Sequence, residues 1–160
     1  MLDLDKSYPY FEEAYQLVKH EGMLDQVIFR IDDPYETFAE KHGDRMGEMN
    51  YMPLLWWNTE DPAAFVDGYL HAPHPPRVIE VLFGEDRTDL LDHVDRIRSR
   101  GIGIMMNPIY PHIAAGRLDD LALSDPDGNW GWVIERGATV IGTDRPVLLM
   151  NYLEESQRRF

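Results

Sequence analysis

Cysteine is absent from this sequence of 160 residues. Its absence excludes disulfides and thiolate metal sites, and it leaves the redox compartment open. Long apolar runs are also missing, since none approaches the roughly 20 residues that a bilayer-spanning helix needs. The amino terminus lacks the basic and then apolar pattern of a signal peptide. We therefore expect a cytoplasmic protein that does not insert stably into a membrane.

Basic residues are scarce relative to acidic ones. The chain has 15 Lys and Arg against 29 Asp and Glu, which gives a formal net charge of -14. Such a chain repels polyanions, so neither nucleic acid nor an anionic membrane surface is expected as a partner. A cation suits this charge better, although an acidic, well-solvated surface explains it equally well.

No glycine-rich phosphate-binding fingerprint follows the first apolar segment, which argues against a dinucleotide-binding doubly wound sheet. The chain instead repeats a short apolar strand followed by a helical pattern. Six segments are predicted as strands: residues 1–4, 27–29, 49–57, 78–83, 102–106 and 139–141. This alternation predicts an all-parallel α/β fold. Because a closed (β/α) barrel has eight units in about 250 residues, we expect residues 1–160 to form one domain, an incomplete TIM barrel of about six units without the first two strands.

Aspartate residues stand at the predicted starts of several helices, often next to a proline. Asp33, Asp61, Asp86 and Asp144 each stand where a helix N-cap is expected. Residues 86–100 carry the clearest helical spacing of apolar residues. Pro53 interrupts the third strand and argues against a central position for it, because proline cannot donate to the ladder.

Functional residues of such a barrel lie at the carboxyl ends of its strands. Carboxylates at these ends suit a hard divalent cation such as Mg²⁺ or Ca²⁺. Asp3 and Asp5 share one face of the first strand beside Lys6, so they are either metal ligands or part of an internal ion pair. Glu80 interrupts an apolar strand and must be paired or ligated if it faces the interior. The strand-end residues predicted to bind substrate are Glu80, Trp56, Asn107 and Asp120.

Several segments resemble the glycerophosphodiester phosphodiesterase family. Residues 137–146, with Thr143-Asp144-Arg145-Pro146 before a leucine-rich helix, are similar to its closing signature. Leu2-Asp3-Leu4-Asp5-Lys6 resembles its third strand. Residues 22–29 resemble the next unit, and residues 102–107 resemble its seventh strand. The similarity runs in order from the third strand to the eighth.

This resemblance implies an eight-stranded barrel that hydrolyses a small phosphodiester substrate, a glycerophosphodiester, to glycerol 3-phosphate and an alcohol with Mg²⁺ or Ca²⁺. It places Asp3, and alternatively Asp5, at the family's third metal ligand. It makes Lys6 the candidate catalytic lysine, although Lys6 lies one place after the family's position. The family's His-Arg-Gly motif, Glu-x-Asp metal pair and second catalytic histidine belong to its first two units, and no residue here matches them.

Four interpretations follow. The chain is a truncated phosphodiesterase-like barrel without its acid–base residues, or a barrel that another chain completes, for example in a homo-oligomer. It is otherwise a non-catalytic binding or interaction module on the same partial barrel. The fourth interpretation is an unrelated barrel enzyme in which Asp3, Asp5 and Glu80 hold the metal.

Overall fold

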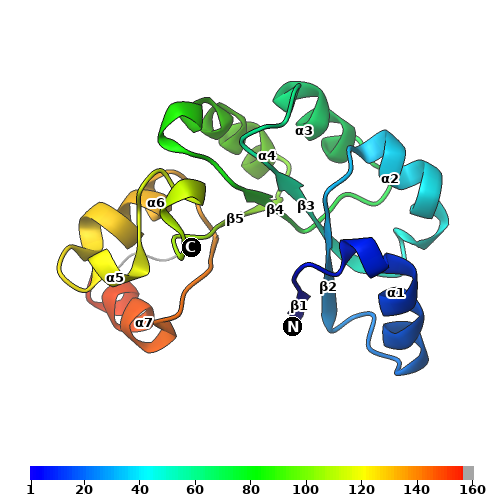
Figure 1. Ribbon diagram of the computed structural model, residues 1–160, viewed down its shortest axis with the longest axis horizontal. Helices are drawn as coiled ribbons and strands as arrows, with labels where there is room; N and C mark the ends of the chain where they lie inside the picture. Colours follow the sequence, from blue (N-terminus) through cyan, green and yellow to red (C-terminus); the bar gives the residue numbers. More distant parts are fainter. Residues whose placement is uncertain (157–160) are drawn as a thin grey trace. The chain divides into compact units, whose positions relative to one another are not determined.

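A computed structural model describes the backbone of residues 1–156, together with their side chains except those of residues 85–87. Six strands form one sheet in the order β1-β2-β3-β4-β5-β6, the order in which they occur in the sequence. Their bounds are β1 Leu2–Leu4, β2 Val27–Ile31, β3 Asn50–Leu55, β4 Val78–Val81, β5 Gly103–Met106 and β6 Val140–Ile141. The strands are parallel and helices alternate with them along the chain, so the predicted incomplete α/β barrel is confirmed (Figure 1).

In residues 1–156, seven α-helices connect or follow the strands. They are α1 Phe11–His20, α2 Tyr35–His42, α3 Pro62–Leu70, α4 Val94–Ser99, α5 Asp119–Ala122, α6 Trp132–Glu135 and α7 Pro146–Glu155. A π-helical turn at Asp127–Gly131 leads into α6. None of the helices in residues 1–156 is long and apolar enough to cross a bilayer.

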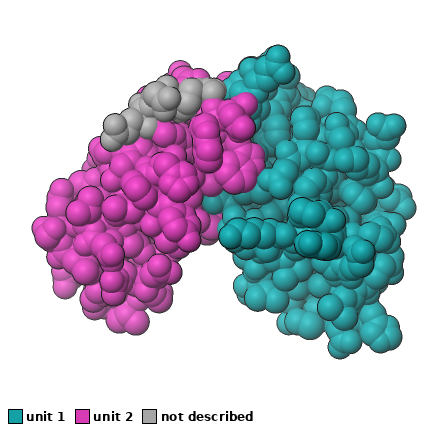
Figure 2. All heavy atoms as spheres, viewed as in Figure 1, with its two compact units in different colours: residues 1–55, 59–80 teal, residues 56–58, 81–160 magenta. Residues whose placement is uncertain are grey.

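The chain divides into two compact units, which Figure 2 distinguishes by colour. Unit 1 contains Met1–Leu55 and Thr59–Glu80, and unit 2 contains Trp56–Asn58 and Val81–Phe160. Unit 1 has an aromatic core, in which the Phe38 ring lies 6.0 Å from Phe11 and 5.3 Å from Tyr51 between ring centroids. In unit 2, a cluster of Ala122, Trp130, Leu149 and Leu153 joins α7 to the helical segment before β6.

The register of the first three strands determines which side chains share a face. Asp3 of β1 pairs with Ile28 of β2, and Arg30 pairs with Met52 of β3. Along β2, Val27, Phe29 and Ile31 are buried, while Ile28 and Arg30 are partly exposed. Because successive strand residues point to opposite faces, Asp3, Ile28 and Arg30 lie on the same face of the sheet.

Pro53 lies inside a central strand, so the argument that proline disfavours such a position does not hold here. It pairs with Ile31, and β3 stands between β2 and β4. Residues 51–55 are all buried. Burial of this apolar run outweighs the loss of one ladder donor.

The predicted helix caps are only partly confirmed. The Asp61 carboxylate accepts a hydrogen bond from Ala64 N at 2.9 Å at the start of α3, as expected. The N-caps of α2 and α7 are instead Pro34 and Arg145, and neither makes a side-chain cap bond. The side chain of Asp86, the remaining predicted cap, lies outside the described side chains.

The helix predicted for residues 86–100 is not continuous. A 3₁₀ helix spans Glu85–His93, and only Val94–Ser99 is α-helical. Leu90, Val94 and Ile97 are nevertheless buried, as their spacing predicted. The first half contains Thr88, Asp89 and Asp92, residue types with low helix propensity, and this is consistent with its tighter, irregular backbone.

Candidate functional site

Arg30 is the centre of a charged cluster in unit 1. Its Nε and Nη2 atoms donate to both carboxylate oxygens of Asp3, at distances of 2.7 to 3.1 Å. The two residues come from neighbouring parallel strands and share a face of the sheet, so their side chains meet directly. This bidentate geometry is the strongest form of an arginine–carboxylate pair.

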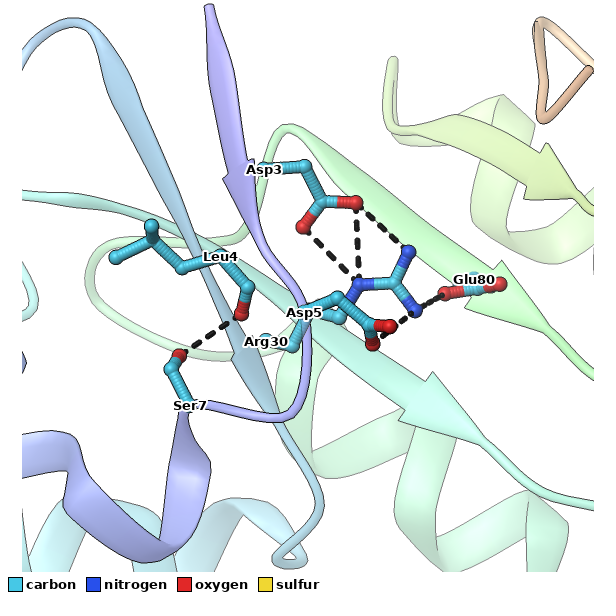
Figure 3. A network of polar contacts seen from close by, with 6 residues as sticks. All are labelled: Asp3, Leu4, Asp5, Ser7, Arg30 and Glu80. Carbon is cyan, nitrogen blue, oxygen red and sulfur yellow. Dashed lines mark hydrogen bonds and ion pairs between the residues drawn. The ribbon is translucent and has the colours of Figure 1, made fainter. Parts of the chain in front are cut away.

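Asp5 and Glu80 complete the cluster (Figure 3). Arg30 Nη1 lies 2.9 Å from Glu80 Oε2 and 3.3 Å from Asp5 Oδ1. Asp5 directly follows β1, and Arg30 and Glu80 stand near the carboxyl ends of β2 and β4. The cluster therefore lies at the edge of the sheet where barrel enzymes place their functional residues.

Burial differs sharply across the cluster. The Glu80 side chain is fully buried, the Arg30 side chain is 13% exposed and the Asp5 side chain is 59% exposed. Burial by itself lowers the pKa of Arg30, but the hydrogen bonds to Asp3 and the charges of Glu80, Asp3 and Asp5 raise it more. The pKa of Arg30 therefore lies above its ordinary value, and the guanidinium is a permanent positive charge.

The cluster offers a divalent cation a poor set of ligands. Both Asp3 oxygens bond the guanidinium, and the nearest oxygens of Glu80 and Asp5 also face it. Mg²⁺ and Ca²⁺ need several oxygens that converge on one point about 2.0–2.6 Å away. Within the described part of the chain, no group of three His, Asp or Glu side chains is placed to hold a metal ion. As arranged here, these residues do not fit the metal that the resemblance implies.

Lys6, the predicted catalytic lysine, is exposed and has a left-handed backbone conformation, with φ of 56°. The next residue, Ser7, donates a hydrogen bond through Oγ to Leu4 O at 2.8 Å. Lys6 thus stands in a tight turn that leads out of β1, one residue after Asp5.

The other predicted site residues belong to unit 2. Trp56 packs edge-to-face on Trp57, with ring centroids 5.2 Å apart. The Asn107 side chain lies close to Gly142, where an added Cβ would be 2.7 Å from Asn107 Oδ1. Asp120 is exposed and pairs with Arg145 Nη2 at 2.6 Å. The structure thus joins Asp3, Asp5 and Glu80 in one cluster, and it gives Trp56, Asn107 and Asp120 separate local contacts.

The roles of two important residues, Arg30 and Asp119, were not predicted from the sequence. Arg30 follows the segment that was expected to end at residue 29, and the alternation of β2 could have placed it on the face of Asp3. Asp119 is buried and accepts hydrogen bonds from Trp130 Nε1, Thr143 Oγ1 and Asp144 N, at 2.7, 2.8 and 2.6 Å. Nothing in its sequence position distinguishes it from Asp120.

A polar cavity of about 420 Å³ lies elsewhere in unit 1. Asn50, at the start of β3, and Arg77, just before β4, contribute to its lining together with Tyr51 and His74. The Tyr51 hydroxyl donates to the His74 carbonyl oxygen, which fixes the proline-rich loop beside the cavity. The cavity is at the amino ends of these strands, the edge that in barrel proteins serves stability.

Comparison with known proteins identifies a family match. Residues 51–153, more than half of the chain, match the profile of a family described as a domain of unknown function. No curated protein matches this sequence. The matched region contains Glu80 and Asp119, and it begins after Asp3 and Arg30.

Proposed function

The chain belongs to the DUF4996 family, a domain of unknown function, and we propose that it is a glycerophosphodiester phosphodiesterase-like barrel domain that does not hydrolyse phosphodiesters by itself. Six parallel β/α units in sequence order support the relationship, together with the resemblance of residues 137–146 to the family's closing signature. The loss of hydrolysis rests on one observation. Asp3, which the resemblance makes a metal ligand, bonds Arg30 through both oxygens.

Acid–base chemistry is the second requirement. Hydrolysis of a phosphodiester needs a group that protonates the leaving alcohol and a group that activates the nucleophile. The resemblance assigns both roles to histidines of the family's first two units, and none of the six histidines of this sequence matches those positions. Lys6 is an exposed ammonium one residue after Asp5 and cannot fill both roles.

An activity assay tests this proposal. The purified 160-residue chain is incubated with glycerophosphodiesters in Mg²⁺, in Ca²⁺ and in a chelator, and release of glycerol 3-phosphate is measured. We expect no release above the buffer rate under any condition, while an active phosphodiesterase in the same buffer serves as the positive control. Metal-dependent release that disappears in Asp3→Ala but persists in Asp25→Ala, which lies at the other end of the strands, would contradict the proposal.

A second candidate function is an interaction module that pairs through its sheet edges. Among the strands that the structure describes, β1 and β6 each have a single neighbour. Apolar side chains are exposed beside both, with Leu2 at 56% and Val140 at 40%. Unpaired strand edges recruit further strands from other chains. One such assembly is a homo-oligomer that completes the barrel, which the sequence analysis also considered.

The mass of the chain in solution tests the second candidate. Light scattering across a concentration series is expected to show a dimer or larger oligomer if the edges pair. A monomer at every concentration would remove the homo-oligomer and leave the monomeric barrel domain.

A further inference from the structure

We propose that Arg30 is the resident cation of the unit 1 cluster and takes the place of the divalent metal ion that the phosphodiesterase resemblance implies. Asp3, Asp5 and Glu80 are then held together without Mg²⁺ or Ca²⁺. The inference concerns cation binding and stability, which calorimetry and melting temperatures measure separately from hydrolysis.

The first argument for this inference is the geometry of the guanidinium. Its three nitrogens all face carboxylate oxygens, since Nε and Nη2 contact Asp3 while Nη1 contacts Glu80 and Asp5. These carboxylates come from β1, from the turn after it and from β4 (Figure 3). A metal ion at a barrel mouth joins strands by attracting carboxylates in the same way. The planar, multidentate donor set of arginine reproduces that role through hydrogen bonds.

The second argument is the burial of Glu80 and Arg30. A carboxylate with no exposed surface, such as that of Glu80, is unstable in the charged state unless a positive group compensates it. Arg30 is itself mostly buried and lies 2.9 Å away. The compensating charge is therefore part of the protein. Because Arg30 is attached to the chain, its interaction with Glu80 avoids the loss of translational freedom that a dissolved ion undergoes on binding.

The third argument is that a divalent ion would compete with the guanidinium for the same carboxylates. A divalent ion entering the cluster would have to displace the guanidinium from Asp3 and would then lie beside its positive charge. The formal charges of one guanidinium and three carboxylates sum to -2, but only the Asp5 side chain is more than half exposed. Without Arg30, the same three carboxylates would carry a formal charge of -3. Removal of the guanidinium should consequently expose a cation site.

Arg30→Gln, measured with and without metal, tests the inference. Wild-type chain is expected to show no heat of Mg²⁺ or Ca²⁺ binding at millimolar concentration and no change in Tm. Arg30→Gln should lower Tm by about 10 °C, because it removes the positive charge that lies against the buried Glu80 carboxylate. Millimolar Ca²⁺ or Mg²⁺ should restore part of that loss, and calorimetry should detect binding that wild type lacks.

Arg45→Gln is the matched control. Arg45 also belongs to unit 1 and pairs with a carboxylate, Glu12, at 2.5 Å, but the Glu12 side chain is 54% exposed. Loss of this pair should lower Tm by no more than about 3 °C and should create no response to metal. The comparison separates the loss of any arginine ion pair from the loss of the buried one.

Two results would overturn the inference. One is metal binding by wild type that Asp3→Asn abolishes, and the other is an Arg30→Gln chain as stable as Arg45→Gln. If Arg30→Gln does not fold, the double variant Arg30→Gln/Glu80→Gln is measured, because it removes the buried negative charge together with the guanidinium. This double variant should fold, and its folding would support the role of Arg30. If neither variant folds, the wild-type calorimetry decides, since absence of binding supports the inference and binding refutes it.

Discussion

Asp119→Ala is expected to lower the free energy of unfolding by about 4 kcal/mol. The Asp119 carboxylate is 4% exposed and accepts hydrogen bonds from Trp130, Thr143 and Asp144. Hydrogen bonds to a charged group contribute about 1.5–3 kcal/mol each. Alanine leaves the buried Trp130 indole N–H without its acceptor, whereas Thr143 and Asp144 belong to the more exposed part of the site, where water can replace the carboxylate. The loss should not be fully additive, because the three bonds share one acceptor. Urea denaturation monitored by tryptophan fluorescence measures the change.

Asp120→Ala is the control for Asp119→Ala. Asp120 is the next residue of α5, but its side chain is 76% exposed and its ion pair with Arg145 lies on the surface. Exposed pairs contribute little, so this variant should change the free energy of unfolding by no more than about 0.5 kcal/mol. Equal effects of the two substitutions would show that Asp119 does not anchor unit 2.

The hydrogen bonds of Asp119 change the interpretation of residues 143–146, the segment that resembles the family's closing signature. Asp144 was predicted to cap the last helix, and Thr143 belongs with it to the segment that resembles the family's closing signature. Instead, the Thr143 hydroxyl and the Asp144 amide donate to Asp119, and Thr143 Oγ1 accepts from Arg145 N at 2.9 Å. The Thr-Asp pair therefore ties the segment after β6 to α5.

Gly137→Ala is expected to lower the free energy of unfolding by about 3 kcal/mol. Gly137 has φ of +96°, a conformation that costs an L-residue about 1–2 kcal/mol. An added Cβ would also lie 2.7 Å from Val94 Cγ1, closer than side-chain contacts allow. Val94 is buried on α4 and cannot move away freely. Overpacking of this kind costs about 1–3 kcal/mol more.

Gly101→Ala isolates the backbone contribution. Gly101 has φ of +75°, and an added Cβ there would meet no atom within 4 Å. Its substitution should cost only about 1 kcal/mol, the conformational part of the Gly137 effect. The difference between the variants, measured by urea denaturation, is the steric cost. If Gly137→Ala proves no more destabilising than Gly101→Ala, the contact with α4 is not tight.

Much of the fold follows from local patterns. Short apolar runs, separated by helical spacing and ended by glycine or by aspartate and proline, predicted the six parallel strands that the sheet contains. Asp61 shows how reliable a local rule is when its partner, Ala64, lies three residues away. Local rules failed where burial outweighed them. Pro53 stays in a central strand, and the helix of residues 86–100 begins as a 3₁₀ segment.

The candidate site was predicted in part. Asp3, Asp5 and Glu80 were correctly placed at strand ends, and the need for Glu80 to be paired was foreseen. Their partner was not, because Arg30 lies 27 residues from Asp3 in the sequence. Metal binding by Asp3 and Asp5 remains a prediction that calorimetry tests. Catalysis by Lys6 and substrate contacts by Trp56, Asn107 and Asp120 also remain predictions.

The sequence by itself determined the class of this protein: a parallel α/β chain with acidic residues at its strand ends and no thiol chemistry. Periodicity and turn residues are local properties, so they can be recognised along the chain. Only the tertiary structure decided the partners of the carboxylates. It pairs Asp3 with Arg30 and Asp119 with Thr143, across 27 and 24 residues. Electrostatic partners depend on distance in space and on burial, and strand register and packing set both.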